Sequence, residues 1–208
     1  HILMDGWSNS QLLGEVLQRY SGKFSAAHAG RYGDYIGWLQ RQDAAASEAF
    51  WLPALRTLDE PTRLAHAIAR PKDAPAVQGY GDHYRVLDSE QTARLGEFAR
   101  ASKVTVNTLV QAAWLLVLQR YTGKASVAFG ATVAGRPADL PGIEQQIGLF
   151  INTLPVIASP RPEQSLGSWL QAVQAQNLAL REFEHTALFD IQRWAGQGGE
   201  ALFDNILV

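Results

Sequence analysis

The chain has 208 residues, of which 47% are hydrophobic and 18% are charged, and this composition excludes a disordered protein because it can bury a core. Its 18 basic and 20 acidic residues leave a net charge of −2, which excludes the broad positive surface that nucleic acids and anionic membranes attract. The absence of cysteine excludes disulfides, thiolate catalysis and cysteine-ligated zinc.

The N-terminal part of the chain predicts helices. A short apolar stretch ends at Asp5-Gly6, which is a turn signal. Ser8 or Ser10 can cap a helix over about residues 11–21. The apolar stripe of this helix recurs at helical spacing: Leu12, Leu13, Val16, Leu17 and Tyr20.

The next segments predict two more helical pieces and a connector. Residues 32–56 are typical of helices, and Pro53 is expected to interrupt them. Residues 59–82 are richer in proline, glycine, aspartate and alanine, which indicates a connector between two subdomains. Residues 83–87 predict a strand.

The remainder of the chain alternates between helical and strand patterns, which is typical of an α/β domain. Helices are predicted over residues 89–101, 105–121, 165–183 and 188–194. Strands are predicted over residues 126–134, 147–157 and 202–208.

The string His1-x-x-x-Asp5-Gly6-Trp7-Ser8 contains the sharpest chemical pattern. A neutral imidazole can take a proton near neutral pH, and a nearby carboxylate can orient it or hold the backbone through an ion pair. Gly6 would let the backbone turn sharply beside such a site. The residues alone leave open a second interpretation, in which Asp5 only caps a helix and His1 has no role.

This string resembles the core motif of condensation domains of nonribosomal peptide synthetases, in which two adjacent histidines precede three variable residues and Asp-Gly. His1 would then be the second histidine, and the chain would start inside the motif. Further segments resemble the other motifs of that family in the same order: residues 32–38, 130–137, 147–155, 185–192 and 202–205.

The resemblance implies an α/β fold, a two-layer sandwich similar to chloramphenicol acetyltransferase, with two lobes around a tunnel. Residues 1–78 would form the tail of the N-terminal lobe and a connector, and residues 79–208 an incomplete C-terminal lobe. The implied enzyme is an amide-forming acyltransferase that joins a carrier-tethered acyl or peptidyl thioester to the amine of a carrier-tethered aminoacyl acceptor.

The resemblance also implies partners. They would be the donor and acceptor peptidyl carrier domains, an adjacent adenylation domain and the missing N-terminal lobe, with neither nucleic acid nor membrane among them. No cofactor or metal would bind directly, because the substrates arrive on the phosphopantetheine of the carriers. The expected location is the cytoplasm.

The resemblance assigns roles to individual residues. His1, Asp5 and Gly6 would form the catalytic motif, with His1 acting as a base or positioning the acceptor amine. Asp5 would pair with an arginine, for which Arg136 is the candidate because it lies in a Gly-Arg-Pro turn. The residues expected to line the substrate or pantetheine tunnel are Trp7, Ser8, Gly135, Asn152 and Thr153.

Several alternatives remain at this point. The chain could come from a related epimerisation domain or an acyl-CoA-dependent acyltransferase, or from a non-catalytic platform that docks carrier domains. Trp7 could instead be a core aromatic residue, and Asn152 could have a structural role. His185 and Asp190 could form a second acid–base pair, although a helix start near the lobe interface is the expected interpretation.

Overall fold

The computed structural model describes residues 3–23, 30–68, 79–196 and 200–208 and has an α/β architecture. The strands are β1 (Val127–Val133), β2 (Asn152–Ala158) and β3 (Ile206–Leu207). The α-helices are α1 (Gly6–Tyr20), α2 (Tyr32–Gln40), α3 (Ala44–Leu55), α4 (Leu64–Ala67), α5 (Ser89–Ala101), α6 (Val106–Thr122), α7 (Leu166–Leu180) and α8 (Leu188–Trp194). Two 3₁₀ helices are η1 (Ile143–Gln145) and η2 (Arg181–Phe183).

The described strands form a sheet in the order β2-β1-β3. β1 runs antiparallel to β2, with Val127 opposite Ala158 at one end and Val133 opposite Asn152 at the other. β3 runs parallel to β1. The end of β1 and the start of β2 therefore lie side by side, and the loop between them (residues 134–151) leaves the sheet from this edge.

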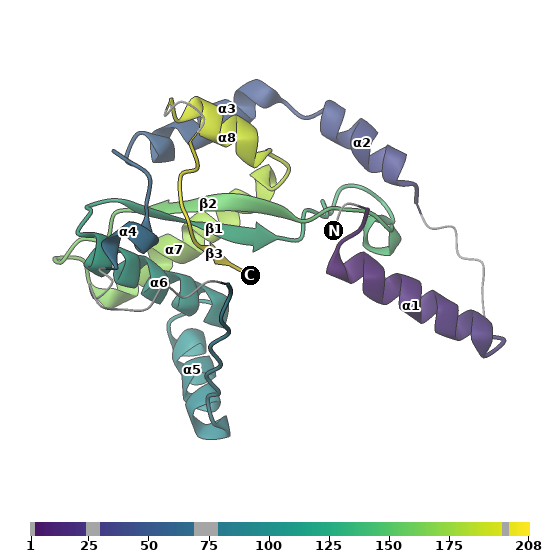
Figure 1. Ribbon diagram of the computed structural model, residues 1–208, viewed down its shortest axis with the longest axis horizontal. Coiled ribbons are helices and arrows are strands. Elements are labelled where there is room, and N and C mark those ends of the chain that lie inside the picture. Colours follow the sequence, from purple (N-terminus) through teal and green to yellow (C-terminus); the bar gives the residue numbers. More distant parts are fainter. Residues whose placement is uncertain (1–2, 24–29, 69–78, 197–199) are drawn as a thin grey trace.

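The main core surrounds the sheet on both sides. Figure 1 shows α3 and α8 on one side of the strands and α6 with α7 on the other. Because β1 is covered on both faces, its first five residues, 127–131, are all buried, and its last two are half-buried. The largest fully buried side chains of this core include Trp51, Leu115, Leu118, Phe129, Leu154 and Ile191.

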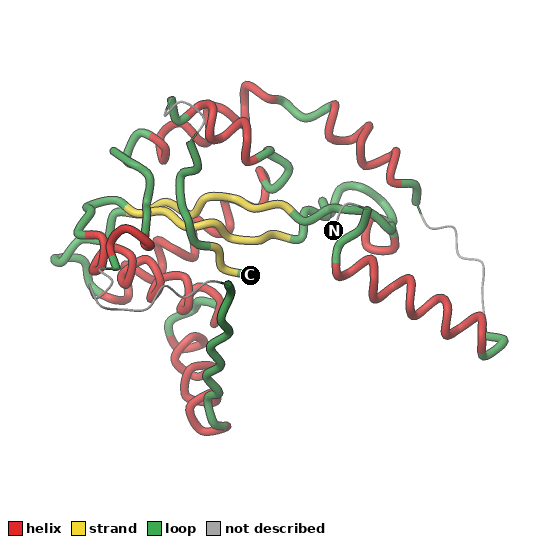
Figure 2. The backbone as a smooth tube through the Cα atoms, viewed as in Figure 1, coloured by secondary structure: helices red, strands yellow, loops and turns green. Residues whose placement is uncertain are grey.

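A second, smaller core lies away from the sheet. Tyr35 of α2 packs there with Ile143 and Phe150, which both belong to the loop between β1 and β2. Figure 2 shows this loop reaching from the strands to the start of α1, while α1 and α2 extend beyond the sheet. The apolar stripe expected along α1 is solvent-exposed here, and Tyr20 is 92% exposed.

Two expectations about helix boundaries were wrong for local reasons. α1 begins at Gly6, earlier than expected, because Asp5 and not a serine accepts the backbone N–H that caps the helix. Pro53 lies inside α3 near its end, where a missing N–H removes one hydrogen bond without ending the helix. The break falls before α3 instead, where Asp43 caps the new helix through the N–H groups of Ala45 and Ala46.

Three strand expectations also change. Residues 83–87 are exposed and unpaired within the described part of the chain, so the strand expected there is absent. β2 starts at Asn152 and not at residue 147, because residues 148–150 bind side chains of α1 and its cap instead of a neighbouring strand. Of the final segment, Ile206 and Leu207 pair with β1, and Phe203 forms an isolated bridge with Thr62.

Among the described residues, no single helix has the length and apolar character to cross a membrane. α5 and α6 meet that test only as a pair, and they are bent by 94° relative to each other.

Replacing Leu115 by alanine tests the main core. Leu115 is 0% exposed, whereas its neighbour Leu116 on α6 is 42% exposed. We expect Leu115→Ala to lower the free energy of unfolding by about 2–5 kcal/mol, because a buried cavity remains. Leu116→Ala should cost roughly 1 kcal/mol or less. Urea unfolding of both variants measures the difference, and equal losses would contradict this placement of α6.

Candidate functional site

The carboxylate of Asp5 is the centre of the site and is 1% exposed. One oxygen, Oδ1, accepts the N–H of Ser8 at 2.8 Å, which caps α1. The other, Oδ2, accepts the N–H of Phe150 at 3.1 Å. The N–H of Asp5 donates to the carbonyl of Gly148 at 3.1 Å, so Asp5 holds the start of α1 against residues 148–150.

Ser8 joins the same two segments from one turn further along α1. Its hydroxyl donates to the carbonyl of Gly148 at 2.9 Å and accepts the N–H of Gly148 at 3.1 Å. The hydroxyl also accepts a hydrogen bond from Arg136 at 2.9 Å. Ser8 is 0% exposed. Its hydroxyl therefore forms a buried connection between α1 and Gly148.

Arg136 completes the network from the turn that follows β1. Its Nη2 lies 3.4 Å from Oδ1 of Asp5, and both side chains are nearly buried. Its Nη1 donates to the carbonyls of Ile143 and Gln146. The guanidinium carbon lies 4.0 Å from the ring centroid of Phe150. A planar guanidinium can satisfy all of these acceptors at once, which a lysine ammonium could not do.

We name Asp5, Ser8 and Arg136, with the backbone of residues 148–150, the Asp5 clasp. Burial of Asp5 would raise the pKa of its carboxyl, but hydrogen bonds from Ser8 and Phe150 and the charge of Arg136 outweigh burial and lower that pKa. The carboxylate is therefore ionised and fully engaged near neutral pH. It acts as a fixed anchor and not as a proton carrier.

Asn152 and Thr153 lie at the start of β2, beside the end of β1. The amide of Asn152 donates to the carbonyls of Glu184 at 2.9 Å and Thr186 at 2.7 Å, and its oxygen accepts the N–H of Thr153. Asn152 therefore fixes the segment 184–186 against the sheet. Thr153 is half-buried and faces Thr132 across the pair of strands.

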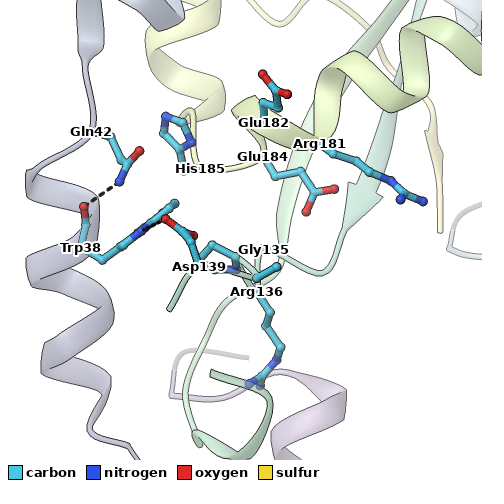
Figure 3. A pocket seen from close by; sticks show the side chains of 11 residues that line it. Trp38, Gln42, Gly135, Arg136, Asp139, Arg181, Glu182, Glu184 and His185 are labelled. Atoms are coloured by element: carbon cyan, nitrogen blue, oxygen red, sulfur yellow. Dashed lines mark hydrogen bonds between the residues drawn. The ribbon is translucent and has the colours of Figure 1, made fainter. Parts of the chain in front are cut away.

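A cavity of about 480 Å³ opens on the other side of the Arg136 turn. Figure 3 shows Trp38, Gln42 and His185 around it, with the guanidinium of Arg136 directed away from them. Nε1 of Trp38 donates to Asp139 at 3.0 Å. The ring of His185 meets Trp38 edge to face at 5.6 Å and lies 3.3 Å from the hydroxyl of Ser47.

Two ionisable groups in this cavity are perturbed. Burial raises the pKa of Glu184, although the N–H of Gly135 and the charge of Arg181 oppose that shift. Burial lowers the pKa of His185, so its ring is neutral near neutral pH. Glu184 connects the Arg136 turn to the segment that follows α7, whereas His185 contacts Trp38 and Ser47.

The structure brings together some of the residues singled out in the sequence. Asp5, Ser8 and Arg136 meet in the clasp, and Gly135 precedes Arg136 with a φ of +63°. Asn152 and Thr153 lie near this turn at the same edge of the sheet. His1 lies outside the described residues, so its catalytic assignment stays a prediction.

Two other candidate residues differ from expectation. Gly6 begins α1 without a positive φ, and a side chain there would meet open space, so the sharp turn expected at Gly6 is absent. Trp7 is 58% exposed and donates to the carbonyl of Glu144, so it is not a core residue. The expectation that Trp7 lines a substrate or pantetheine tunnel stays a prediction. The same holds for the other residues expected there: Ser8, Gly135, Asn152 and Thr153.

Sequence reasoning missed several contacts. The sequence does not indicate that Ser8 joins α1 to Gly148, or that Phe150 lies beneath the guanidinium of Arg136. Asp190 pairs with Arg193 at 2.8 Å and not with His185, which excludes that acid–base pair. The described residues contain no group of histidine and acidic side chains that could hold a metal ion.

Replacing Asp5 by asparagine tests the charge at the centre of the clasp. The native pKa of Asp5 is below the ordinary value of 3.8, so ionisation of Asp5 stabilises the fold above that pH. Asp5→Asn should cost about 3–5 kcal/mol at pH 7. The difference from the wild type should shrink as the pH falls below about 3.8 and the native carboxyl becomes protonated. Chemical unfolding across pH 2–7 measures this, with the exposed Asp59→Asn as control. A difference that does not depend on pH would contradict the interpretation.

Replacing Gly135 by alanine tests the turn that presents Arg136. A Cβ at Gly135 would lie 1.8 Å from the carbonyl oxygen of Phe150, whereas a Cβ at Gly142, which has a similar φ of +73°, would meet nothing within 4 Å. We expect Gly142→Ala to cost about 1–2 kcal/mol for its left-handed backbone. Gly135→Ala should cost about 1–3 kcal/mol more because of the clash. Thermal unfolding separates the two, and equal losses would show that the close approach to Phe150 is wrong.

Comparison with known proteins agrees with this geometry. The family model described as "Condensation domain" matches residues 1–208. One of the linear gramicidin synthase proteins of Brevibacillus parabrevis is 42% identical over the whole chain, which covers 3% of that protein. Chondramide synthase of Chondromyces crocatus is 41% identical, and the chain covers 5% of it.

Solved structures share the fold. The first condensation domain of the calcium-dependent antibiotic synthetase, in complex with substrate analogue 2a, has a TM-score of 0.74 and 24% identity, with 99% of this chain and 48% of that one covered. The starter condensation domain of rhizomide synthetase, in complex with C8-CoA and Leu-SNAC, has a TM-score of 0.71 and 22% identity, with 99% and 47% covered. These likenesses confirm the predicted α/β fold. The chain belongs to the condensation domain family of nonribosomal peptide synthetases and spans about half the length of such a solved domain.

Proposed function

We propose that the domain containing this chain forms peptide bonds in nonribosomal peptide synthesis. The observation that carries this proposal is the Asp5 clasp, which fixes the Asp5-Gly6 end of the family's core motif against the turn that carries Arg136. This anchor supports the proposal because it holds Asp5 itself against residues 148–150, just before β2 begins.

The proposed reaction joins two thioester-bound groups. The amine nitrogen of an aminoacyl acceptor attacks the thioester carbonyl carbon of an acyl or peptidyl donor. The new C–N bond forms, the C–S bond breaks, and the donor carrier leaves as a thiol. His1 takes the proton from the amine and passes it to the leaving sulfur, or it positions the amine while the proton passes directly to that sulfur. Asp5 and Arg136 hold the motif and take no part in proton transfer.

The proposal includes the carriers of both substrates. The related rhizomide synthetase domain is described in complex with an acyl-CoA and an aminoacyl N-acetylcysteamine thioester, which mimic such carriers. Peptidyl carrier domains would deliver both groups on phosphopantetheine, and an adenylation domain would load the acceptor. The remaining lobe of the domain would cover the exposed apolar stripe of α1 and complete the tunnel.

The packing of α3 refines the assignment of residues to the two lobes. Trp51 and Leu55 of α3 pack in the main core with strands of the C-terminal part of the chain. This packing supports a lobe boundary before α3, within residues 41–43, and not at residue 78.

A cysteine-free chain needs no oxidising compartment, and we place the enzyme in the cytoplasm.

Replacing His1 by alanine in the intact domain tests the proposed function. We expect dipeptide formation on loaded carrier domains to fall at least about 100-fold, the typical contribution of a catalytic acid–base group. The melting temperature should not change, because the Asp5 clasp is intact. The exposed His83→Ala serves as a matched control and should retain full activity.

Three outcomes would contradict the assignment. Unchanged turnover in His1→Ala would remove His1 from the mechanism. Proton exchange at the α-carbon of a tethered aminoacyl group, without a condensation product, would indicate an epimerisation domain. Carrier binding with no chemistry in the wild-type domain would indicate a docking platform.

A further inference from the structure

A row of ring contacts connects His185 with the Asp5 clasp. The ring of His185 meets that of Trp38 edge to face, with 5.6 Å between their centroids. Trp38 stacks on Tyr35 at 6.1 Å, with 11° between the two planes. Tyr35 in turn meets Phe150 at 4.8 Å. We name these four residues the ring row, which runs from the cavity beside His185 into the smaller core.

The far end of the ring row contacts the charged centre of the clasp. The guanidinium carbon of Arg136 lies 4.0 Å from the centroid of the Phe150 ring. The N–H of Phe150 donates to Asp5 at 3.1 Å. A second connection runs through Trp38, whose Nε1 donates at 3.0 Å to Asp139 in the turn that carries Arg136. Close-packed rings pass a displacement from one end of the row to the other, because a protein interior holds few voids.

His185 lies at the end of the ring row where its side chain has room to move. Its backbone is fixed, because Asn152 donates to the carbonyls on both sides of it, those of Glu184 at 2.9 Å and Thr186 at 2.7 Å. Its ring lies 3.3 Å from the hydroxyl of Ser47 and lines the cavity of about 480 Å³. A change in the charge of this ring is therefore expected to move the ring and not the chain.

The charged groups around the His185 ring come from the turn after β1 and from its own segment. The described ones that line the cavity are Arg136, Asp139, Arg181, Glu182 and Glu184. Figure 3 shows the guanidinium of Arg136 directed away from the ring. Burial lowers the pKa of His185, and the carbonyl of Glu182 and the charge of Asp139 offset only part of that shift.

The two helices that pack against His185 present uncharged groups to it. From α2 come Trp38 and, behind it, Tyr35, which stays neutral because burial raises its pKa to about 12. From α3 comes the hydroxyl of Ser47, while the carboxylate of Asp43 accepts N–H groups at the start of that helix. Glu184 is the other cavity group whose titration burial moves toward neutral pH, and it serves as a control below.

We propose that His185 is a positioning residue for the reaction: its neutral ring holds the ring row, and the row holds the guanidinium of Arg136 in the clasp. The effect on turnover rests on the proposed function. Protonation gives the ring a charge that prefers water to the contact with Trp38, so the ring turns toward the cavity. Phe150 then loses support on the side away from Arg136, and the clasp loosens.

The direction of the pH dependence follows from linkage. The packed site lowers the pKa of His185, so protonation weakens the packing by the same free energy. The contact contributes fully above the ordinary histidine pKa of 6.5 and is lost as the pH falls through the lowered value. Acid therefore releases the ring row from this end.

The amide signal of Phe150 tests the proposal without turnover, because this N–H donates to Asp5. We expect it to shift in NMR spectra of the intact domain as the pH falls from about 8 to about 5, with the midpoint of the His185 ring signals. In His185→Phe, whose ring stays neutral, this shift should be lost. His83→Ala removes an exposed histidine instead, and the Phe150 signal should titrate as in the wild type.

Dipeptide formation on loaded carriers gives a second readout. We expect His185→Ala to lower kcat about two- to tenfold at neutral pH, the effect of losing one aromatic pair, and to leave KM for the loaded carriers unchanged. His185→Phe should restore kcat, because it restores the ring. In acid, the rate of the wild type should fall with two ionisations, those of His1 and His185, whereas that of His185→Phe should fall with one.

A Phe150 signal that titrates in folded His185→Phe as it does in the wild type would overturn the proposal. So would a titration that Glu184→Gln removes, because Glu184 would then be the group that senses pH. Melting temperatures identify a variant that fails to fold, and His185→Gln, for which the same loss of titration is expected, then replaces His185→Phe. Failure of the proposed function is distinguishable, because a domain that forms no peptide bond would still show the His185-dependent shift of Phe150.

Discussion

The buried carboxylate of Asp5 is the constraint on which the rest of the site depends. An ionised carboxylate that is 1% exposed is tolerated only if its oxygens accept hydrogen bonds or face an opposite charge. Ser8, Phe150 and Arg136 supply those partners, and each comes from a different segment of the chain. The need to satisfy one charge thus fixes the start of α1, the loop before β2 and the turn after β1 relative to one another.

The sequence allowed the type and order of most elements to be predicted, because helical and strand periodicities are local. It also led to the pairing of Asp5 with Arg136, although through a family resemblance and not through spacing. The roles of Ser8 and Phe150 could not be predicted, since their partners are more than 100 residues away. For the same reason residues 147–151 were mistaken for part of a strand. Their composition suits a strand, but the backbone groups of Gly148 and Phe150 bond to Asp5 and Ser8 instead.

Glu184 lines two separate cavities. On one side is the cavity lined by Trp38, Asp139 and His185, and on the other is a smaller cavity lined by residues of α6, α7 and the sheet. Asn152 holds the backbone of Glu184, so the position of this carboxylate is set by the sheet. The start of β2 therefore fixes the position of residues 184–186, and Glu184 of this segment lines both cavities. Asn152 is only half-buried, yet its two hydrogen bonds fix the backbone of the segment that carries Glu184 and His185.

The Asp5 clasp also constrains the order in which the protein can assemble. Asp5 and Arg136 are 131 residues apart in the chain, whereas β1 and β2 are joined by a loop of 18 residues, 134–151. Closing the longer loop carries the larger entropic cost, so the hairpin has the advantage of forming before the clasp. During synthesis, Asp5 leaves the ribosome long before Arg136 and Phe150 are made. The motif at the N-terminal end of this chain is therefore the part whose anchoring must wait for the C-terminal body to fold.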